Sequence, residues 1–126
     1  MSATARDPNS LLPLTPAVFH ILLALADRER HGYGIMQEVQ ERTNGEVRLG
    51  PGTLYGAIKR LISDGLIKES EKRPDPALDD ERRTYYRLTP FGLKVTQAEV
   101  NRLADMVAQA RTKRFIPGST FVLGGG

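Results

Sequence analysis

Residues 49–67 read LGPGTLYGAIKRLISDGLI, a stretch that predicts a short helix with one apolar and one polar face. Four apolar side chains share one stripe at helical spacing: Leu54, Ile58, Leu61 and Ile62. Thr53, Ala57, Lys59, Arg60 and Ser63 lie largely on the other side. Gly50 suits the N-cap, Pro51 the first helical position and Gly65 a left-handed last turn. A capped helix with a basic outer face is a candidate for reading nucleic acid, although spacing alone favours an ordinary amphipathic surface helix.

A second helix is predicted just before this stretch, over residues 34–43. Ile35, Met36 and Val39 give it a narrow apolar face, and Asn44 with Gly45 provides a stop signal. Residues 28–31 before it read as a polar break. Two helices joined by a brief turn, the second one basic outside, form a helix-turn-helix pattern.

After Gly65 the pattern of side chains is no longer helical, and residues 66–72 and 83–88 are predicted to form two short strands. The segment RPDPALDDER at residues 73–82 joins them, and its two prolines and four carboxylates predict a long loop rather than a tight turn. A helix-turn-helix followed by such a hairpin predicts a winged helix. The acidic tip would repel a DNA backbone, so contacts are expected from the flanks of this wing.

Two further helices flank this unit, and each begins with threonine and proline, at Thr15 and Pro16 and again at Thr89 and Pro90. The first, VFHILLALAD at residues 18–27, is apolar nearly all round, which predicts one side against the core and another against a second subunit. The last, running to residue 114, carries apolar side chains in steps of three and four, the spacing of a coiled coil. We expect a dimer, and the alternative is a monomer with this helix folded back. The predicted interface residues are Phe19, Leu22, Leu93, Val100, Leu103 and Val107.

Length and composition fit one module with two tails. The chain has 126 residues, a formal net charge of +3 and no cysteine, so disulfides and thiolate metal sites are excluded. His20 and His31 are isolated, no nucleophile sits in a catalytic arrangement, and no apolar run could span a membrane. We therefore expect a cytoplasmic protein that is not an enzyme and needs no cofactor or metal.

The predicted organisation is mainly α with a small β-hairpin. Residues 1–13 form a flexible N-terminal arm, 14–88 the winged helix-turn-helix, 89–114 a dimerisation helix and 115–126 a disordered tail.

Three segments together resemble the PadR family of transcriptional regulators: HGYGI at residues 31–35, GPGTLYGAIKRLISDGLI at 50–67 and RRTYYRLTPFG at 82–92. The single helix after the wing is similar to the smaller members of that family. The resemblance implies a homodimer that binds a palindromic operator in double-stranded DNA and typically represses. It also implies a small apolar effector bound at the dimer interface, although the chain has no tryptophan to stack on a flat ligand.

The candidate DNA contacts lie at the start of the recognition helix, one turn beyond Tyr55 and on the wing. Gly52 and Thr53 offer backbone amides and a hydroxyl, and Lys59 and Arg60 offer cations to phosphates. Tyr55 could donate its hydroxyl to a phosphate or pack partly against the second helix. The complete candidate set is Gly52, Thr53, Tyr55, Lys59, Arg60, Arg73, Arg82 and Arg83. The alternative function is a winged-helix module for protein-protein contact without sequence-specific DNA binding, and a steep salt dependence of DNA binding would distinguish the two.

Overall fold

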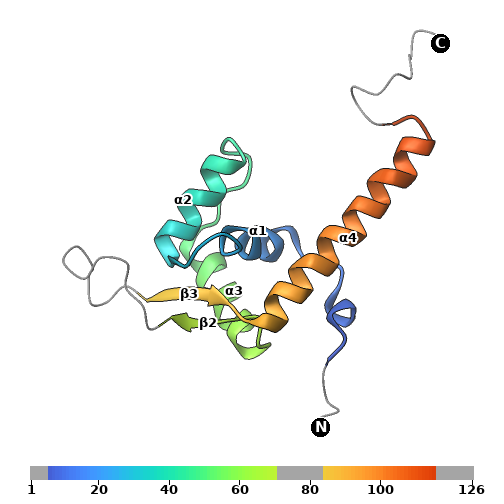
Figure 1. Cartoon of the computed structure of the whole chain (residues 1–126). Coiled ribbons are helices and arrows are strands. Elements are labelled where there is room, and N and C mark those ends of the chain that lie inside the picture. Colours follow the sequence, from blue (N-terminus) through green and yellow to red (C-terminus); the bar gives the residue numbers. More distant parts are fainter. Residues whose placement is uncertain (1–5, 71–83, 116–126) are drawn as a thin grey trace.

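The computed structural model describes residues 6–70 and 84–115, which fold into a helical body with a small sheet and one projecting helix (Figure 1). In chain order the elements are η1 (Pro8–Leu11, a 3-10 helix), α1 (Pro16–Ala24), β1 (Arg30–His31), α2 (Gly32–Arg42), α3 (Pro51–Ser63), β2 (Ile67–Ser70), β3 (Tyr85–Leu88) and α4 (Pro90–Thr112). The predicted fold class, mainly α with a winged helix-turn-helix, is confirmed.

Short polar residues start the helices where the sequence predicts them. The Thr15 hydroxyl accepts a hydrogen bond from the Val18 amide, and the Thr89 hydroxyl accepts one from the Gly92 amide. Each threonine is followed by a proline in the first turn. At the other ends, Asn44, Gly45 and Gly65 have positive φ angles, so the chain leaves α2 and α3 through left-handed residues.

The sheet has three antiparallel strands in the order β1-β3-β2, one strand more than the predicted hairpin. Ile67 lies opposite Leu88 and Lys68 opposite Arg87, while the two residues of β1 pair with Tyr85 and Tyr86. The expectation of a polar break over residues 28–31 was therefore wrong for Arg30 and His31. A strand of two residues has no periodic signal, and its partner lies more than fifty positions along the chain.

The core lies where α1, α2 and α3 meet one face of the sheet. Its fully buried side chains include Ile21 and Leu22 of α1, Ile35 of α2 and Leu54 of α3. Ile62, predicted as part of the inner stripe of α3, is 39% exposed and lies at the edge of that stripe.

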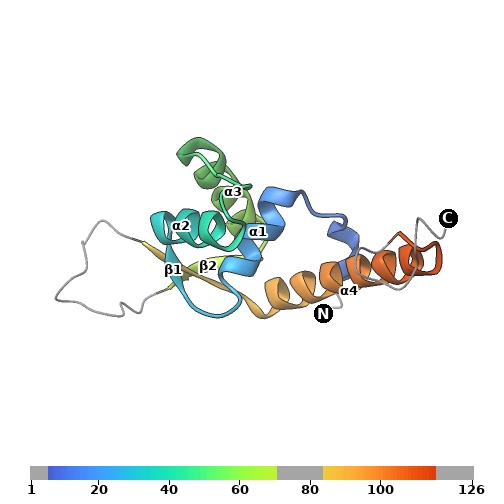
Figure 2. The same ribbon diagram turned by 90° about the horizontal axis from the view of Figure 1, so that it is seen from above.

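The two halves of α4 have different surroundings. Val95, Thr96 and Glu99 in the first half are buried against the body, whereas the second half projects away from it (Figures 1 and 2). Within the described residues no helix is both long and apolar enough to cross a membrane.

Part of the predicted flexible arm is packed against α4. The Glu99 carboxylate accepts a hydrogen bond from the Leu14 amide at 3.0 Å, and the Arg6 guanidinium stacks on the Phe91 ring at 4.5 Å. Arg6 also donates to the Asp64 carbonyl at the end of α3. Arg6 therefore links the predicted arm to α3 and α4, and Leu14, the first residue after that arm, is linked to α4. The flexibility of residues 1–13 stays a prediction.

The start of α4 is fastened to the turn that follows α3. The Thr89 amide donates to the Leu66 carbonyl at 3.0 Å, and the Thr89 hydroxyl donates to the Gly65 carbonyl at 2.6 Å. A Cβ at Gly92 would overlap the Leu66 carbonyl oxygen, so only glycine allows this close approach. The position of α4 is therefore coupled directly to the end of α3.

Candidate nucleic-acid interface

One face of α3 is buried in the core, and the opposite face is exposed to solvent. Leu54, Ile58 and Leu61 are at most 3% exposed and anchor the helix in the core. The outer residues Gly52, Thr53, Gly56, Lys59, Arg60 and Ser63 are all exposed. The structure therefore separates the residues that position α3 from the residues that could touch a ligand.

The N-terminus of α3 has no side-chain cap among the residues that the structure describes. Gly50 occupies the N-cap and, lacking a side chain, leaves the amides of the first turn without a side-chain acceptor. A Cβ at Gly52 or at Gly56 would meet nothing within 4 Å, so neither glycine is required by a neighbouring element of the described chain. This open surface, at the positive end of a helix, suits an approaching phosphate or base edge.

Two cations follow on the same outer face. Lys59 and Arg60 are exposed, and within the described residues neither makes an ion pair or a side-chain hydrogen bond. Arg42 and Arg102, by contrast, are each held by a glutamate on their own helix. Lys59 and Arg60 are thus available to an anionic partner.

Tyr55 packs against the second helix, which is one of the two roles that the sequence left open, and its role as a phosphate contact stays a prediction. Its ring lies over Gly32 at the start of α2, where a Cβ would come within 2.6 Å of the ring's Cζ, yet 48% of the residue is exposed. Burial, chiefly, and the neighbouring Tyr55 raise the pKa of Tyr86 in β3. Tyr55 therefore packs between α2 and the sheet and still presents part of its surface outward.

Sequence reasoning missed a second tyrosine near this surface. Tyr33, at the second position of α2, is 56% exposed, and its ring is parallel to that of His31 at a centroid distance of 6.5 Å. The His31 Nδ1 accepts the Gly34 amide at 3.0 Å, and the His31 ring meets the Tyr85 ring edge-on at 5.1 Å. Tyr33 lies in the motif HGYGI, between two glycines at the start of α2.

Three predicted contacts, Arg73, Arg82 and Arg83, lie outside the described residues. The strands that lead to them, β2 and β3, are formed and paired through Ser70 and Tyr85. The contribution of these arginines stays a prediction.

The residues predicted for a dimer interface fall into two groups. Leu22 is completely buried in the core of the protomer and presents no surface to a second subunit, while Phe19 is partly exposed. On α4, Leu93 is 57%, Val107 46% and Val100 38% exposed, and Leu103 is partly exposed. Met106 and Phe115, at 52% and 75% exposure, add apolar surface that the predicted set omitted.

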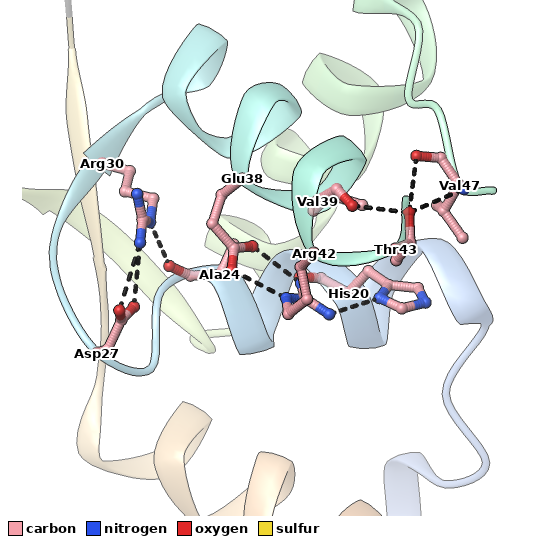
Figure 3. A network of polar contacts seen from close by, with 9 residues as sticks. All are labelled: His20, Ala24, Asp27, Arg30, Glu38, Val39, Arg42, Thr43 and Val47. Carbon is pink, nitrogen blue, oxygen red and sulfur yellow. Dashed lines mark hydrogen bonds and ion pairs between the residues drawn. The ribbon is translucent and has the colours of Figure 1, made fainter. Parts of the chain in front are cut away.

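A polar network joins α1 to α2 (Figure 3). Arg42 forms an ion pair with Glu38 at 2.9 Å and donates to the Nδ1 and the carbonyl oxygen of His20. Because a guanidinium can only donate, the Nδ1 of His20 must be unprotonated. Burial and Arg42 lower the pKa of His20, against an opposing effect of Glu38. The neutral His20 ring therefore links α1 to α2 through Arg42.

Glu99 is a buried carboxylate that the sequence did not single out. It is 2% exposed and receives hydrogen bonds from Arg102 at 2.6 and 3.0 Å and from the Leu14 amide. The Arg102 guanidinium holds the pKa of Glu99 below its usual value, while burial opposes this effect. Within the described part of the chain, no group of three histidine, aspartate or glutamate side chains is placed to hold a metal ion.

Comparison with known proteins agrees with this geometry. The pattern of the transcriptional regulator PadR-like family matches residues 21–98. A transcriptional regulator of Mycobacterium tuberculosis is 36% identical over 90 residues, covering 71% of this chain and 78% of that protein. An uncharacterized 37.1 kDa transposon protein of Streptomyces fradiae is 37% identical over 86 residues, covering 68% of this chain but only 22% of that longer protein. Among solved structures, a PadR family transcription regulator from Clostridium difficile superposes with a TM-score of 0.63 at 26% identity, covering 78% of this chain and 97% of that one.

Proposed function

Because the chain belongs to the PadR-like family of transcriptional regulators, we propose that it is a homodimeric repressor that binds a palindromic operator through α3. The observation that carries this proposal is the outer face of α3. It combines open backbone amides at the helix start with two cations, Lys59 and Arg60, that have no partner within the described residues. A surface of this kind suits a polyanion, and the buried inner face keeps it rigid.

The DNA contact proposed for each residue of α3 depends on how deep that residue would enter the major groove. Gly52 and Thr53, at the N-terminal end, would go deepest into the major groove and meet base edges or a phosphate. Lys59 and Arg60, about two turns further along, would neutralise phosphates on the groove wall. The open space around Gly52 and Gly56 supports a close approach of the DNA backbone or bases to the helix.

Tyrosine hydroxyls beside α3 would fix the register of the complex. Tyr55 and Tyr33 are each about half exposed while their rings rest on Gly32 and His31. A tyrosine held in this way loses little conformational freedom when its hydroxyl donates to a phosphate. Such contacts orient the protein and carry no sequence information.

The second half of α4 would supply the dimer contact. Its exposed apolar side chains include Val100, Met106 and Val107, and exposed apolar side chains gathered on one helix often mark a contact with another protein chain. A twofold dimer would present two α3 helices to two half-sites, so its operator would be a palindrome. A small apolar effector would bind where the two α4 helices meet, and because α4 is fastened to the end of α3, it could shift the two reading helices relative to each other. A protein that acts on the chromosome in this way is expected in the cytoplasm.

Selection of bound fragments from genomic DNA tests this function. We expect a recovered motif with two inverted half-sites about one helical turn apart, bound at least about 10³-fold more tightly than scrambled DNA. Sedimentation of the full chain should give a dimer at micromolar concentration. Absence of detectable DNA binding even at low salt would contradict the proposal and favour the alternative of a module for protein-protein contact.

A further inference from the structure

We propose that a pocket on the side of the domain away from α3 binds a small phosphate monoester with an apolar body. The pocket has a volume of about 590 Å³ and lies between the loop from α1 to β1, the outer face of β2 and β3, and the start of α4. Figure 2 shows α3 on one side of the domain and the α1 to β1 loop on the opposite side. The lining residues that matter here are Leu25, Arg28, Lys68, Arg87, Leu88 and Leu93.

Two cations face each other across the sheet at this pocket. Lys68 of β2 lies directly opposite Arg87 of β3 in the antiparallel register, and both residues are exposed. Like charges at directly opposed positions destabilise a strand pair. Within the described residues neither side chain makes an ion pair or a hydrogen bond that would offset this repulsion. An anion bound between them would remove the repulsion.

The charge of the pocket matches a dianion. Arg28 adds a third exposed cation to the lining, and it too has no ion pair among the described side chains. Of the two lining carboxylates, Asp27 is engaged by Arg30 at 3.3 Å, and Arg30 is itself fixed to the Ala24 carbonyl (Figure 3). Three cations against the remaining carboxylate, Glu29, leave a net charge of +2.

Glu29 is also restrained, because its Oε1 accepts a hydrogen bond from the Ser70 hydroxyl at 2.6 Å. A phosphate monoester carries about −1.5 to −2 charges near neutral pH, which balances this pocket better than a monoanion does. Thr89 and Pro90 also line the pocket, so the positive end of the α4 dipole lies beside the proposed phosphate.

The rest of the lining predicts an apolar body on the ligand. Leu25 is buried and Leu88 is half-buried, and both belong to the lining. Leu93, also in the lining, leaves 57% of its surface exposed. The volume lies within the range of about 300–1,000 Å³ found for small-molecule sites. A phosphate attached to an aromatic or aliphatic group would therefore fill both the charged and the apolar part.

The test uses phenyl phosphate as the probe, with inorganic phosphate and benzyl alcohol as separate controls for its two halves. In a titration of the full chain followed by amide NMR signals, phenyl phosphate should give saturable shifts around Lys68, Arg87 and Leu93. It should bind at least about ten-fold more tightly than either control, because each control satisfies only part of the pocket. Equal affinity for phenyl phosphate and inorganic phosphate would overturn the proposal, because it would indicate nonspecific ion binding.

Variants locate the site. Lys68→Gln combined with Arg87→Gln should weaken phenyl phosphate binding by about ten-fold or more, whereas Lys68→Arg, which keeps the charge, should retain it. Arg111→Gln combined with Lys113→Gln removes the same charge at the far end of α4 and should change nothing. The proposal is wrong if both double variants lose binding equally or if neither does.

This inference goes beyond the proposed DNA binding, and a further measurement keeps the two apart. Phenyl phosphate should stay bound when duplex DNA is added, because the loop from α1 to β1 that lines the pocket lies on the opposite side of the domain from α3 (Figure 2). Displacement by DNA would show that the pocket cations are DNA contacts and would refute a separate site. A chain that binds no DNA but binds phenyl phosphate as described would contradict the repressor function and leave the pocket intact.

Discussion

Replacing Gly92 by alanine should disrupt the close contact between the start of α4 and the turn that follows α3. The new Cβ would lie 2.8 Å from the Leu66 carbonyl carbon, about 0.7 Å inside the optimal distance for two carbon atoms, and would overlap the attached oxygen. Backbone atoms cannot rotate away as a side chain can. The start of α4 must then move, and the two hydrogen bonds from Thr89 to Leu66 and Gly65 must lengthen or break.

The expected loss in the free energy of unfolding can be worked out from the overpacking, the lost hydrogen bonds and the change in helix propensity. Overpacking costs about 1–3 kcal/mol and each lost hydrogen bond about 0.5–1.5 kcal/mol, against a gain of at most about 1 kcal/mol from better helix propensity. We therefore expect the free energy of unfolding to fall by about 2–4 kcal/mol, which lowers the urea midpoint by about 1–2 M.

The assay is urea unfolding at equal protein concentration, with Gly56→Ala as the matched control. A Cβ at Gly56 meets nothing within 4 Å, so this variant should be as stable as the wild type or up to about 1 kcal/mol more stable. If Gly92→Ala unfolds at the wild-type midpoint, or if both variants lose stability equally, then the close approach of α4 to Leu66 does not hold the domain together.

Three other perturbations test separate contacts. Glu99→Gln should lower the free energy of unfolding at neutral pH by about 1–3 kcal/mol, because Arg102 loses its charged partner. Since the folded pKa of Glu99 is lowered, this stabilisation is present above the ordinary value of 4.5 and is lost as pH falls, so the difference between wild type and variant should close in acid. A difference that does not change with pH would argue against a charged Glu99. The folded pKa of His20 is also lowered, so the free energy of unfolding of the wild type should decrease as pH falls below 6.5. In thermal unfolding measured across that pH range, His20→Gln should show a smaller decrease. If the variant has the same pH profile as the wild type, His20 does not titrate as described. Leu103→Asp should convert a dimer to a monomer in sedimentation, whereas Ala104→Asp, at an exposed neighbouring position, should not.

The sequence was most informative where structure depends on neighbouring residues. Thr15 with Pro16, and Thr89 with Pro90, define helix starts within a few positions, and Gly65 marks the end of α3 in the same way. The inner stripe of α3 was also predictable, because helical spacing selects Leu54, Ile58 and Leu61 without reference to the rest of the fold.

Contacts between distant segments were not predictable. Arg30 and His31 become a strand only because β3 passes beside them, and the segment around Leu14 is held by Glu99, 85 positions away. Nothing local distinguishes Leu22 from Phe19 on a helix that is apolar nearly all round, so the sequence could not show which of them the core would bury.

In the candidate interface, too, some features were predictable from neighbouring residues and others were not. The exposure of Lys59 and Arg60 was predictable from helical spacing within α3. Tyr33 and His31 are also close in sequence, but no spacing rule predicts that their rings lie parallel. The opposed pair of Lys68 and Arg87 depends on the register between two strands, which neither strand determines alone.

The central claim is that α3 binds the phosphates of an operator, and the salt dependence of binding tests it most directly. The measurement is the slope of log affinity against log salt concentration for the wild type and for Lys59→Ala combined with Arg60→Ala. Each neutralised phosphate contributes about 0.9 to this slope, so four cations lost from a dimer should reduce it by about 3.6. Arg111→Ala combined with Lys113→Ala, far along α4, should leave the slope unchanged. A wild type whose binding does not vary with salt, or a Lys59 and Arg60 variant with the wild-type slope, would contradict the account.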